Sequence, residues 1–200
     1  MSSAPYQQPV ADVAFWVLLG LFALGEYAMQ FRSIRDRIRH RSGKRSERWS
    51  LVAVLIGVVG GLVGGVRLAA WSPGRITAGA WPLFVVGLVL MAAGLSLRQW
   101  SMVVLGRFFT PDVRVHAGQT VIERGPYRWV RHPSYTGLIV FFVGFGLAFT
   151  NWAALIWLVV LPTAGLVVRI HAEEKTLAAA LGDDYRRFAA TRARLFPGVW

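Results

Sequence analysis

Long apolar stretches separated by polar connections dominate the residue pattern of this chain. Three of them, residues 10–31, 51–70 and 81–97, are each close to the ~20 residues that a helix needs to cross a bilayer. They are apolar on all sides, whereas a helix of a soluble domain has a single apolar stripe. The pattern therefore predicts an all-α, polytopic membrane bundle.

The fourth apolar stretch, residues 138–168, is too long for one span, and Thr150-Asn151 interrupts it. We predict a tight helical hairpin of two short spans, 138–149 and 152–170. Pro162 lies inside the second span and should kink it, while neighbouring helices can satisfy the freed carbonyl. The chain is thus expected to have about five transmembrane helices, of which the last two form the hairpin.

The distribution of Lys and Arg predicts the orientation of these spans, because basic residues concentrate in cytoplasmic connections. Connection 32–50, segment 98–134 and tail 169–200 are rich in Arg, whereas 71–80 and 150–151 carry almost no basic residue. This alternation places the N-terminus outside, and the C-terminus in the cytoplasm, of a multi-pass protein of the cell inner membrane. The first ten residues hold no Lys or Arg, so no cleaved signal peptide is expected.

Two features of the first spans each have two interpretations. Connection 32–50 is an orientation signal, or it also holds anionic lipid headgroups, at about 1 kcal/mol per basic residue near the surface. The second stretch carries glycines spaced four apart, at positions 57, 60, 61, 64 and 65. Such spacing lets helix backbones approach closely. We expect it to serve packing within the bundle, and a homodimer face is the alternative.

The composition agrees with a membrane protein, since 55% of the 200 residues are hydrophobic and 16% are charged. This hydrophobicity excludes a disordered chain. The lack of cysteine excludes a disulfide scaffold, Cys-ligated zinc and thiol catalysis. The basic connections explain the net charge of +12, so neither nucleic acid nor a metal is an expected partner. We divide the chain into 1–105, with three spans, and 106–200, which holds the candidate chemistry.

Polar residues gather at two places on the expected cytoplasmic side, and such residues near membrane depth are candidates for function. In the first place, 106–137, Pro133 suits the first position of a helix, and His132 before it favours extended backbone. The N-terminus of that helix is an anion site, with Arg131 and His132 beside it and Tyr127 and Tyr135 nearby. Anchoring at the membrane interface is the alternative interpretation.

The second place is the cytoplasmic end of the last span, which the hairpin would bring next to the first place. Arg169 and Glu173 are four residues apart, so they share a helix face and could pair, whereas the adjacent Glu174 points elsewhere. One carboxylate could then face a ligand, or both are solvated charges. His171 is expected to be interfacial rather than catalytic. The tail beyond Lys175 predicts a short amphipathic cap on the cytoplasmic face.

These two places together resemble the isoprenylcysteine carboxyl methyltransferase family, part of a wider group of membrane methyltransferases that includes phospholipid methyltransferases. The resemblance rests on Gly125-Pro126-Tyr127-Arg128-x-x-Arg131-His132-Pro133-x-Tyr135-x-Gly137, then on Glu173-Glu174-x-x-Leu177 and Gly182-x-x-Tyr185. It covers about residues 105–195, and the first two spans carry no recognisable motif.

The resemblance implies a methyltransferase that holds S-adenosyl-L-methionine in a cytoplasmic pocket. The implied cofactor-binding residues are Gln119, Thr120, Val121, Ile122, Tyr127, Arg131, His132, Pro133, Ser134, Tyr135, Glu173 and Glu174. The implied catalytic residues are Arg169, as a substrate-binding group, and His132. Gln119 stands where the family has a histidine, and Ile122 stands where it has a valine.

The implied acceptor is a lipophilic or prenyl-type molecule that enters sideways between helices from the membrane. A carboxylate acceptor needs alignment, partial desolvation and a cation such as Arg169, whereas a thiol or an amine would need His132 or His171 as a base. Two alternatives stay open. One is an NADPH-dependent membrane reductase of the sterol-reductase type, whose usual Asn-Tyr-x-Gly-Glu element is Ser134-Tyr135-Thr136-Gly137-Leu138 here. The other is a non-catalytic membrane scaffold.

Overall fold

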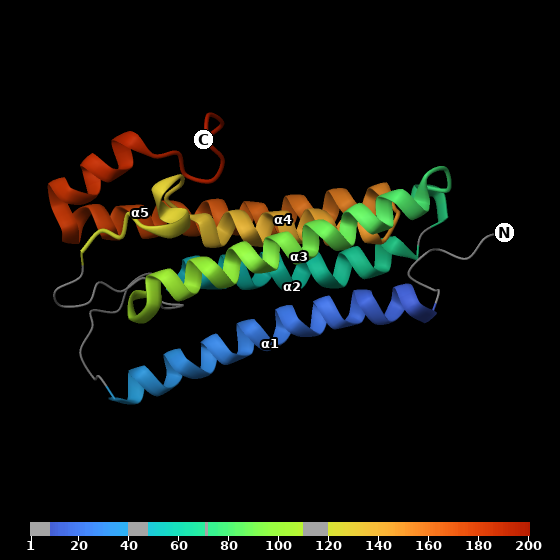
Figure 1. The fold of residues 1–200 in the computed structure, drawn as a ribbon, viewed down its shortest axis with the longest axis horizontal. Coiled ribbons are helices and arrows are strands. Elements are labelled where there is room, and N and C mark those ends of the chain that lie inside the picture. The colour runs from blue at the N-terminus through green and yellow to red at the C-terminus, as the bar shows by residue number, and fades with distance from the viewer. Residues whose placement is uncertain (1–8, 40–47, 71, 110–119) are drawn as a thin grey trace.

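A computed structural model of the protein describes residues 9–39, 48–70, 72–109 and 120–200. Within these ranges the chain is all-α, with five α-helices in an elongated bundle (Figure 1). The helices are α1 (Pro9–Arg39), α2 (Arg48–Ala69), α3 (Ala80–Leu105), α4 (Pro133–Ala148) and α5 (Trp152–Thr191). Short 3₁₀ turns connect them at η2 (Ser72–Gly74), η3 (Gly106–Phe108) and η4 (Gly125–Arg128).

Three helices of the described chain are long and apolar enough to cross a membrane, namely Trp49–Ala69, Ala80–Leu105 and Trp152–Thr191. α4 is apolar but shorter. Large apolar side chains such as Ile56, Val89 and Ile156 are exposed on the outer faces of these helices, as expected for contact with lipid. The prediction of an integral membrane protein is confirmed, and the orientation of the spans stays a prediction.

The predicted hairpin is present, since α4 and α5 flank a tight turn at Thr150-Asn151. Thr150 has a positive φ of 47°, and the Asn151 side chain caps α5 by accepting a hydrogen bond from the Ala154 N–H at 3.1 Å. The same turn is tied to the connection between α2 and α3, because the Ile76 N–H donates to the Thr150 carbonyl at 2.8 Å. The turn therefore joins both halves of the bundle at one end.

α5 is longer than the predicted span and continues through Thr191. Pro162 lies inside α5, and the residues around it keep helical φ and ψ. The backbone angles leave the helical region only at Gly182, where φ is 56° and ψ is −129°. That combination is open to glycine and costly for other residues. Figure 1 shows the consequence, because the red end of the chain turns back over the bundle.

Glycines set the spacing of two helix pairs. In α3 and α4, a Cβ built on Gly94 would lie 2.5 Å from the Gly137 carbonyl oxygen, and Gly87 meets Gly144 in the same way. In α2 and α5, a Cβ on Gly57 would lie 2.8 Å from the Leu161 carbonyl oxygen. Backbones in such contact leave no room for side chains. The prediction that the glycines of the second span pack within the bundle is confirmed.

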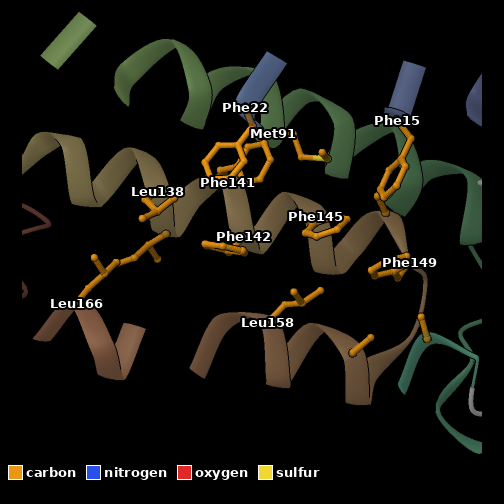
Figure 2. Packing of buried hydrophobic residues seen from close by; sticks show 14 of the residues in the cluster. Phe15, Phe22, Met91, Leu138, Phe141, Phe142, Phe145, Phe149, Leu158 and Leu166 are labelled. Carbon is orange, nitrogen blue, oxygen red and sulfur yellow. The ribbon is translucent and has the colours of Figure 1, made fainter. Parts of the chain in front are cut away.

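The apolar core runs along α4, which is buried on nearly all sides. Figure 2 shows phenylalanines of α1 and α4 facing each other, with Phe22 stacked on Phe141 at a ring distance of 4.3 Å. Leu158 and Leu166 of α5 close the core from the opposite side and are fully buried. Helices from both sides of residue 105 contribute to this core. The expected division of the chain at that residue stays a prediction.

Candidate functional site

A pocket lies at the end of the bundle where α3 ends and α4 begins. It is partly open to solvent, and the pocket together with that open part comprises about 870 Å³. Its walls come from the end of α3, residues 120–122, η4, the start of α4 and α5. The lining residues are Leu105, Phe108, Phe109, Thr120, Val121, Ile122, Tyr127, Arg131, His132, Ser134, Tyr135, Arg169, Glu173, Leu177, Leu181, Tyr185 and Phe188.

The turn before α4 positions Tyr127 and His132. Gly125 has a positive φ of 59°, which starts η4 and directs Tyr127 into the interior. Burial raises the pKa of the Tyr127 hydroxyl, and the charge of Glu173 raises it further, so this hydroxyl remains a proton donor at neutral pH. α4 begins at Pro133, as predicted, and His132 before it is non-helical with φ −124°.

Glu173 faces the pocket, where its Oε2 atom accepts a hydrogen bond from the Tyr135 hydroxyl at 2.7 Å. The Tyr135 ring stacks on the His132 ring at 5.6 Å. Arg169, one helical turn before Glu173, is buried in the same wall, and its Nη1 donates to the Ser50 hydroxyl of α2 at 2.9 Å. A carboxylate and a guanidinium thus line one wall of the pocket.

Glu174 points away from Glu173, as expected for adjacent helical positions, and lies behind the pocket lining. Its Oε1 atom is 2.9 Å from Arg131 Nη1 and 3.2 Å from His132 Nε2, and its Oε2 atom is 3.0 Å from Arg194 Nε. Glu174 lies beyond the apolar 152–170 part of α5. Burial opposes its ionisation, but the hydrogen bonds and charges of His132, Arg194 and Arg131 prevail and lower its pKa. Glu174 therefore orients two pocket residues.

The C-terminal segment completes this arrangement. The N–H groups of Arg131 and His132 donate to the carbonyls of Ala193 and Arg194 at 2.9 and 3.0 Å. The Thr136 hydroxyl donates to the Leu195 carbonyl at 2.7 Å. The tail predicted to form an amphipathic cap covers this end of the bundle, and its apolar side, formed by Leu177, Leu181, Tyr185 and Phe188, lines the pocket. Its place on the cytoplasmic face stays a prediction.

A buried ion pair supports the same region from the membrane side. The Arg98 guanidinium of α3 pairs with Glu26 of α1, with Nη2 at 2.8 Å from Oε2, and it donates to the Ser134 hydroxyl at 2.9 Å. The sequence predicted that the third span ends at residue 97, just before the charged Arg98. The ion pair with Glu26 compensates the charge of Arg98, and α3 continues past it to Leu105.

Most residues predicted for the site line the pocket: Thr120, Val121, Ile122, Tyr127, Arg131, His132, Ser134, Tyr135, Arg169 and Glu173. Pro133 is buried in the first turn of α4, and Gln119 lies outside the described residues. His171 is exposed, does not line the pocket, and donates from Nδ1 to the carbonyl of Val167 at 2.8 Å.

Sequence reasoning missed the apolar and aromatic part of the lining. These residues are Leu105, Phe108, Phe109, Leu177, Leu181, Tyr185 and Phe188. The helix-like spacing of the last four was visible in the sequence, but it fits a membrane-surface cap equally well. The observed lining therefore combines the predicted carboxylate and guanidinium groups with apolar and aromatic side chains that were not predicted.

The pocket fits a polar organic cofactor. Among the described residues, the buried Nε atom of Arg131 and the buried hydroxyl of Tyr185 have no hydrogen-bond partner. Both residues line the pocket, and a buried donor without a partner costs about 1–3 kcal/mol. A ligand with acceptor oxygens would satisfy them. The geometry therefore defines a membrane-embedded helical bundle with a small-molecule site at one end.

A model of the isoprenylcysteine carboxyl methyltransferase family matches residues 85–179 of the chain. This range contains the motif segment 125–137 and Glu173-Glu174-x-x-Leu177, whereas Gly182-x-x-Tyr185 lies beyond it. The resemblance to this family is confirmed for residues 85–179.

The relatives include isoprenylcysteine methyltransferases and a steroid reductase. The probable protein-S-isoprenylcysteine O-methyltransferase of Oryza sativa subsp. indica is 31% identical over 111 residues, which are 54% of this chain and 58% of that protein. Protein-S-isoprenylcysteine O-methyltransferase A of Arabidopsis thaliana is 28% identical over 123 residues, 60% of this chain and 61% of that protein. Steroid 5-alpha-reductase DET2 of Solanum lycopersicum is 31% identical over 122 residues, 60% of this chain and 44% of that protein. The chain thus spans about half the length of the relatives it matches.

Proposed function

We propose that the protein is a membrane methyltransferase that uses S-adenosyl-L-methionine to methylate a lipophilic acceptor, with an isoprenylcysteine-like carboxylate as the first candidate. The observation that carries the proposal is the convergence of both motif halves on one pocket, where the Tyr135 hydroxyl donates to Glu173 at 2.7 Å. Residues 38 positions apart meet there, and family membership of residues 85–179 supports the assignment.

The cofactor would supply an activated methyl group when bound. Glu173 can accept hydrogen bonds from ribose hydroxyls or balance the amine of the methionyl part. Arg131 and His132 can face its carboxylate. Phe108, Phe109 and Phe188 provide apolar surface for a base. Thr120, Val121 and Ile122 line the wall beside residue 119.

The acceptor would meet Arg169, whose guanidinium can hold a carboxylate through two parallel hydrogen bonds. A carboxylate needs alignment and partial loss of water but no base. A thiol or an amine would need a base, and His171 is outside the lining, which leaves His132, whose Nε2 faces Glu174 at 3.2 Å. A carboxylate is the first candidate because it needs only the Arg169 cation and no base.

The proposed orientation places the pocket on the cytoplasmic side, because the basic segments 32–50, 98–134 and 169–200 flank it in sequence. The lipid part of the acceptor would then enter from the cytoplasmic half of the bilayer. Membrane lipids would surround the apolar outer faces of α2, α3 and α5, and the Arg-rich connection would contact anionic headgroups.

A reductase is the second candidate, because steroid 5-alpha-reductase DET2 is 31% identical over 122 residues. Against it, Ser134 and Leu138 stand where the sterol-reductase element usually has Asn and Glu. A non-catalytic scaffold has no need of the buried donors of Arg131 and Tyr185, which argues for a ligand.

Calorimetric titration of the purified protein in detergent with S-adenosylmethionine, S-adenosylhomocysteine and NADPH separates these candidates. Binding of the two adenosyl compounds, without NADPH, supports the methyltransferase and justifies a screen of prenylated thio-carboxylates, phospholipid amines and small thiols. Binding of NADPH alone supports the reductase. Binding of none of them, in detergent and in lipid nanodiscs, supports the scaffold.

A further inference from the structure

The segment after Gly182 contributes a polar side chain to the pocket, Tyr185, to which the resemblance assigns no role in binding or catalysis. Tyr185 is buried, with 5% of its surface exposed, and it lines the pocket. Its position follows from the bend at Gly182, where φ is 56°, because that bend folds residues 183–191 back toward the start of α4. The segment also lies beyond residue 179, where the family match ends.

Among the described residues, neither the Tyr185 hydroxyl nor Nε of Arg131 has a well-formed hydrogen-bond partner. The two groups are neighbours, because the Arg131 guanidinium acts on the Tyr185 hydroxyl through its charge and through a weak side-chain hydrogen bond. A guanidinium can only donate, so the Tyr185 oxygen is the acceptor of that contact and its proton still lacks an acceptor. Folding buried both donors although each loses its hydrogen bond to water, at a cost of about 1–3 kcal/mol each. A bound acceptor group would remove that cost.

The local charge indicates an anionic acceptor group. Arg131 and Arg194 both contact Glu174, so two guanidinium groups face one carboxylate and leave an excess of one positive charge. The remaining carboxylate of the pocket, Glu173, accepts from the Tyr135 hydroxyl at 2.7 Å. Its charge also reaches the Tyr185 hydroxyl, but the Arg169 guanidinium lines the same pocket and offsets it. Two convergent donors with an excess positive charge suit a carboxylate.

We propose that the Tyr185 hydroxyl and the Arg131 guanidinium together bind the carboxylate at the methionyl end of the cofactor, which makes Tyr185 a ligand-contacting residue of the site. This inference rests on the proposed function, because it names the part of that cofactor which the pair would recognise. It gives the bend at Gly182 a role in binding, since the bend brings the hydroxyl to the pocket.

The experiment compares two ligands that differ in one group: S-adenosylhomocysteine and its decarboxylated analogue, in which a hydrogen replaces the carboxylate. Calorimetry in nanodiscs measures both dissociation constants for the wild type, Tyr185→Phe and Arg131→Lys. Tyr27→Phe is the matched control, because Tyr27 is exposed on α1 and is not among the lining residues.

We expect Tyr185→Phe to weaken S-adenosylhomocysteine about 10- to 100-fold, the range for a hydrogen bond to a charged group, and to leave the analogue within about 3-fold of its wild-type affinity. Arg131→Lys should discriminate in the same direction. Unchanged affinity for both ligands, or equal loss for both, overturns the inference. The ratio between the two ligands decides even if a variant is less stable, because partial unfolding weakens both equally. A wild type that binds neither ligand overturns the proposed function itself.

Discussion

The Glu174 carboxylate accepts a hydrogen bond from the Arg194 side chain, 20 residues further along the chain, at 3.0 Å. The same carboxylate contacts Arg131 at 2.9 Å and His132 at 3.2 Å. One buried group thus connects the C-terminal segment to the two basic residues that precede α4. The pocket wall depends on a contact that lies outside the pocket.

Glu174 should consequently matter more for stability than any one of its partners. Glu174→Ala leaves three basic groups without their shared acceptor, at a cost of about 1–3 kcal/mol. Arg194→Ala removes a partly exposed partner, at a cost below about 1 kcal/mol. Thermal unfolding in detergent should show a loss of several degrees for the first variant and a smaller loss for the second. A larger loss for Arg194→Ala would contradict this assignment of roles.

The lowered pKa of Glu174 predicts an acid dependence of stability. A carboxyl whose folded pKa lies below its usual value of 4.5 stabilises the folded state above that pH, and the contribution is lost as the pH falls through the folded pKa. The melting temperature should therefore drop below pH 4.5, and it should drop less steeply in Glu174→Gln. Identical pH profiles for both proteins would show that another carboxyl is responsible.

Replacement of His132 or Glu173 by alanine should abolish binding of the cofactor while the protein stays folded in detergent. Glu173→Ala removes the acceptor of the Tyr135 hydroxyl, and His132→Ala removes the ring that stacks on Tyr135. Titration with S-adenosylhomocysteine measures the effect, expected to exceed about 100-fold, as for the loss of a buried charged hydrogen bond.

His171→Ala is the control for that experiment, since His171 is exposed and outside the pocket lining. It should bind the cofactor with wild-type affinity. Unchanged affinity in both His132→Ala and Glu173→Ala would mean that the cofactor binds elsewhere.

The backbone contact between α3 and α4 predicts the effect of a single methyl group. Gly94→Ala places a Cβ 2.5 Å from the Gly137 carbonyl oxygen, so the helices must separate, at a cost of about 1–3 kcal/mol. Gly20→Ala in α1 is the matched control, because nothing lies within 4 Å of its Cβ. Melting temperatures in detergent should fall for the first variant and stay constant or rise for the second.

The sequence predicts the features that local chemistry determines. Apolar length gives the helices, Thr150-Asn151 gives the hairpin turn, and Pro133 gives the start of α4. The proximity of the two motif halves follows from the hairpin alone. The pocket residues between 120 and 135 were predicted from the resemblance to the methyltransferase family, and most of them line the pocket.

The features that were missed depend on long-range pairing. Nothing local indicates that Arg98 finds Glu26 across 72 positions, so a charged residue was taken as the limit of a span. The apolar spacing of Leu177, Leu181 and Tyr185 fits a lipid surface and a pocket wall equally well. The choice between them depends on the backbone angles of Gly182, which composition does not reveal.

The hydrogen bond from Ile76 to Thr150 has a mechanical consequence. Glycine contacts join α3 to α4 and α2 to α5, and the Ile76–Thr150 bond fastens these two helix pairs at one end of the bundle. At the other end, the contacts of Glu173 with Tyr135 and of Glu174 with Arg131 and His132 fasten α5 to the start of α4. The two helix pairs are thus held together at both ends, so the pocket has walls fixed by polar contacts on one side and by backbone packing on the other.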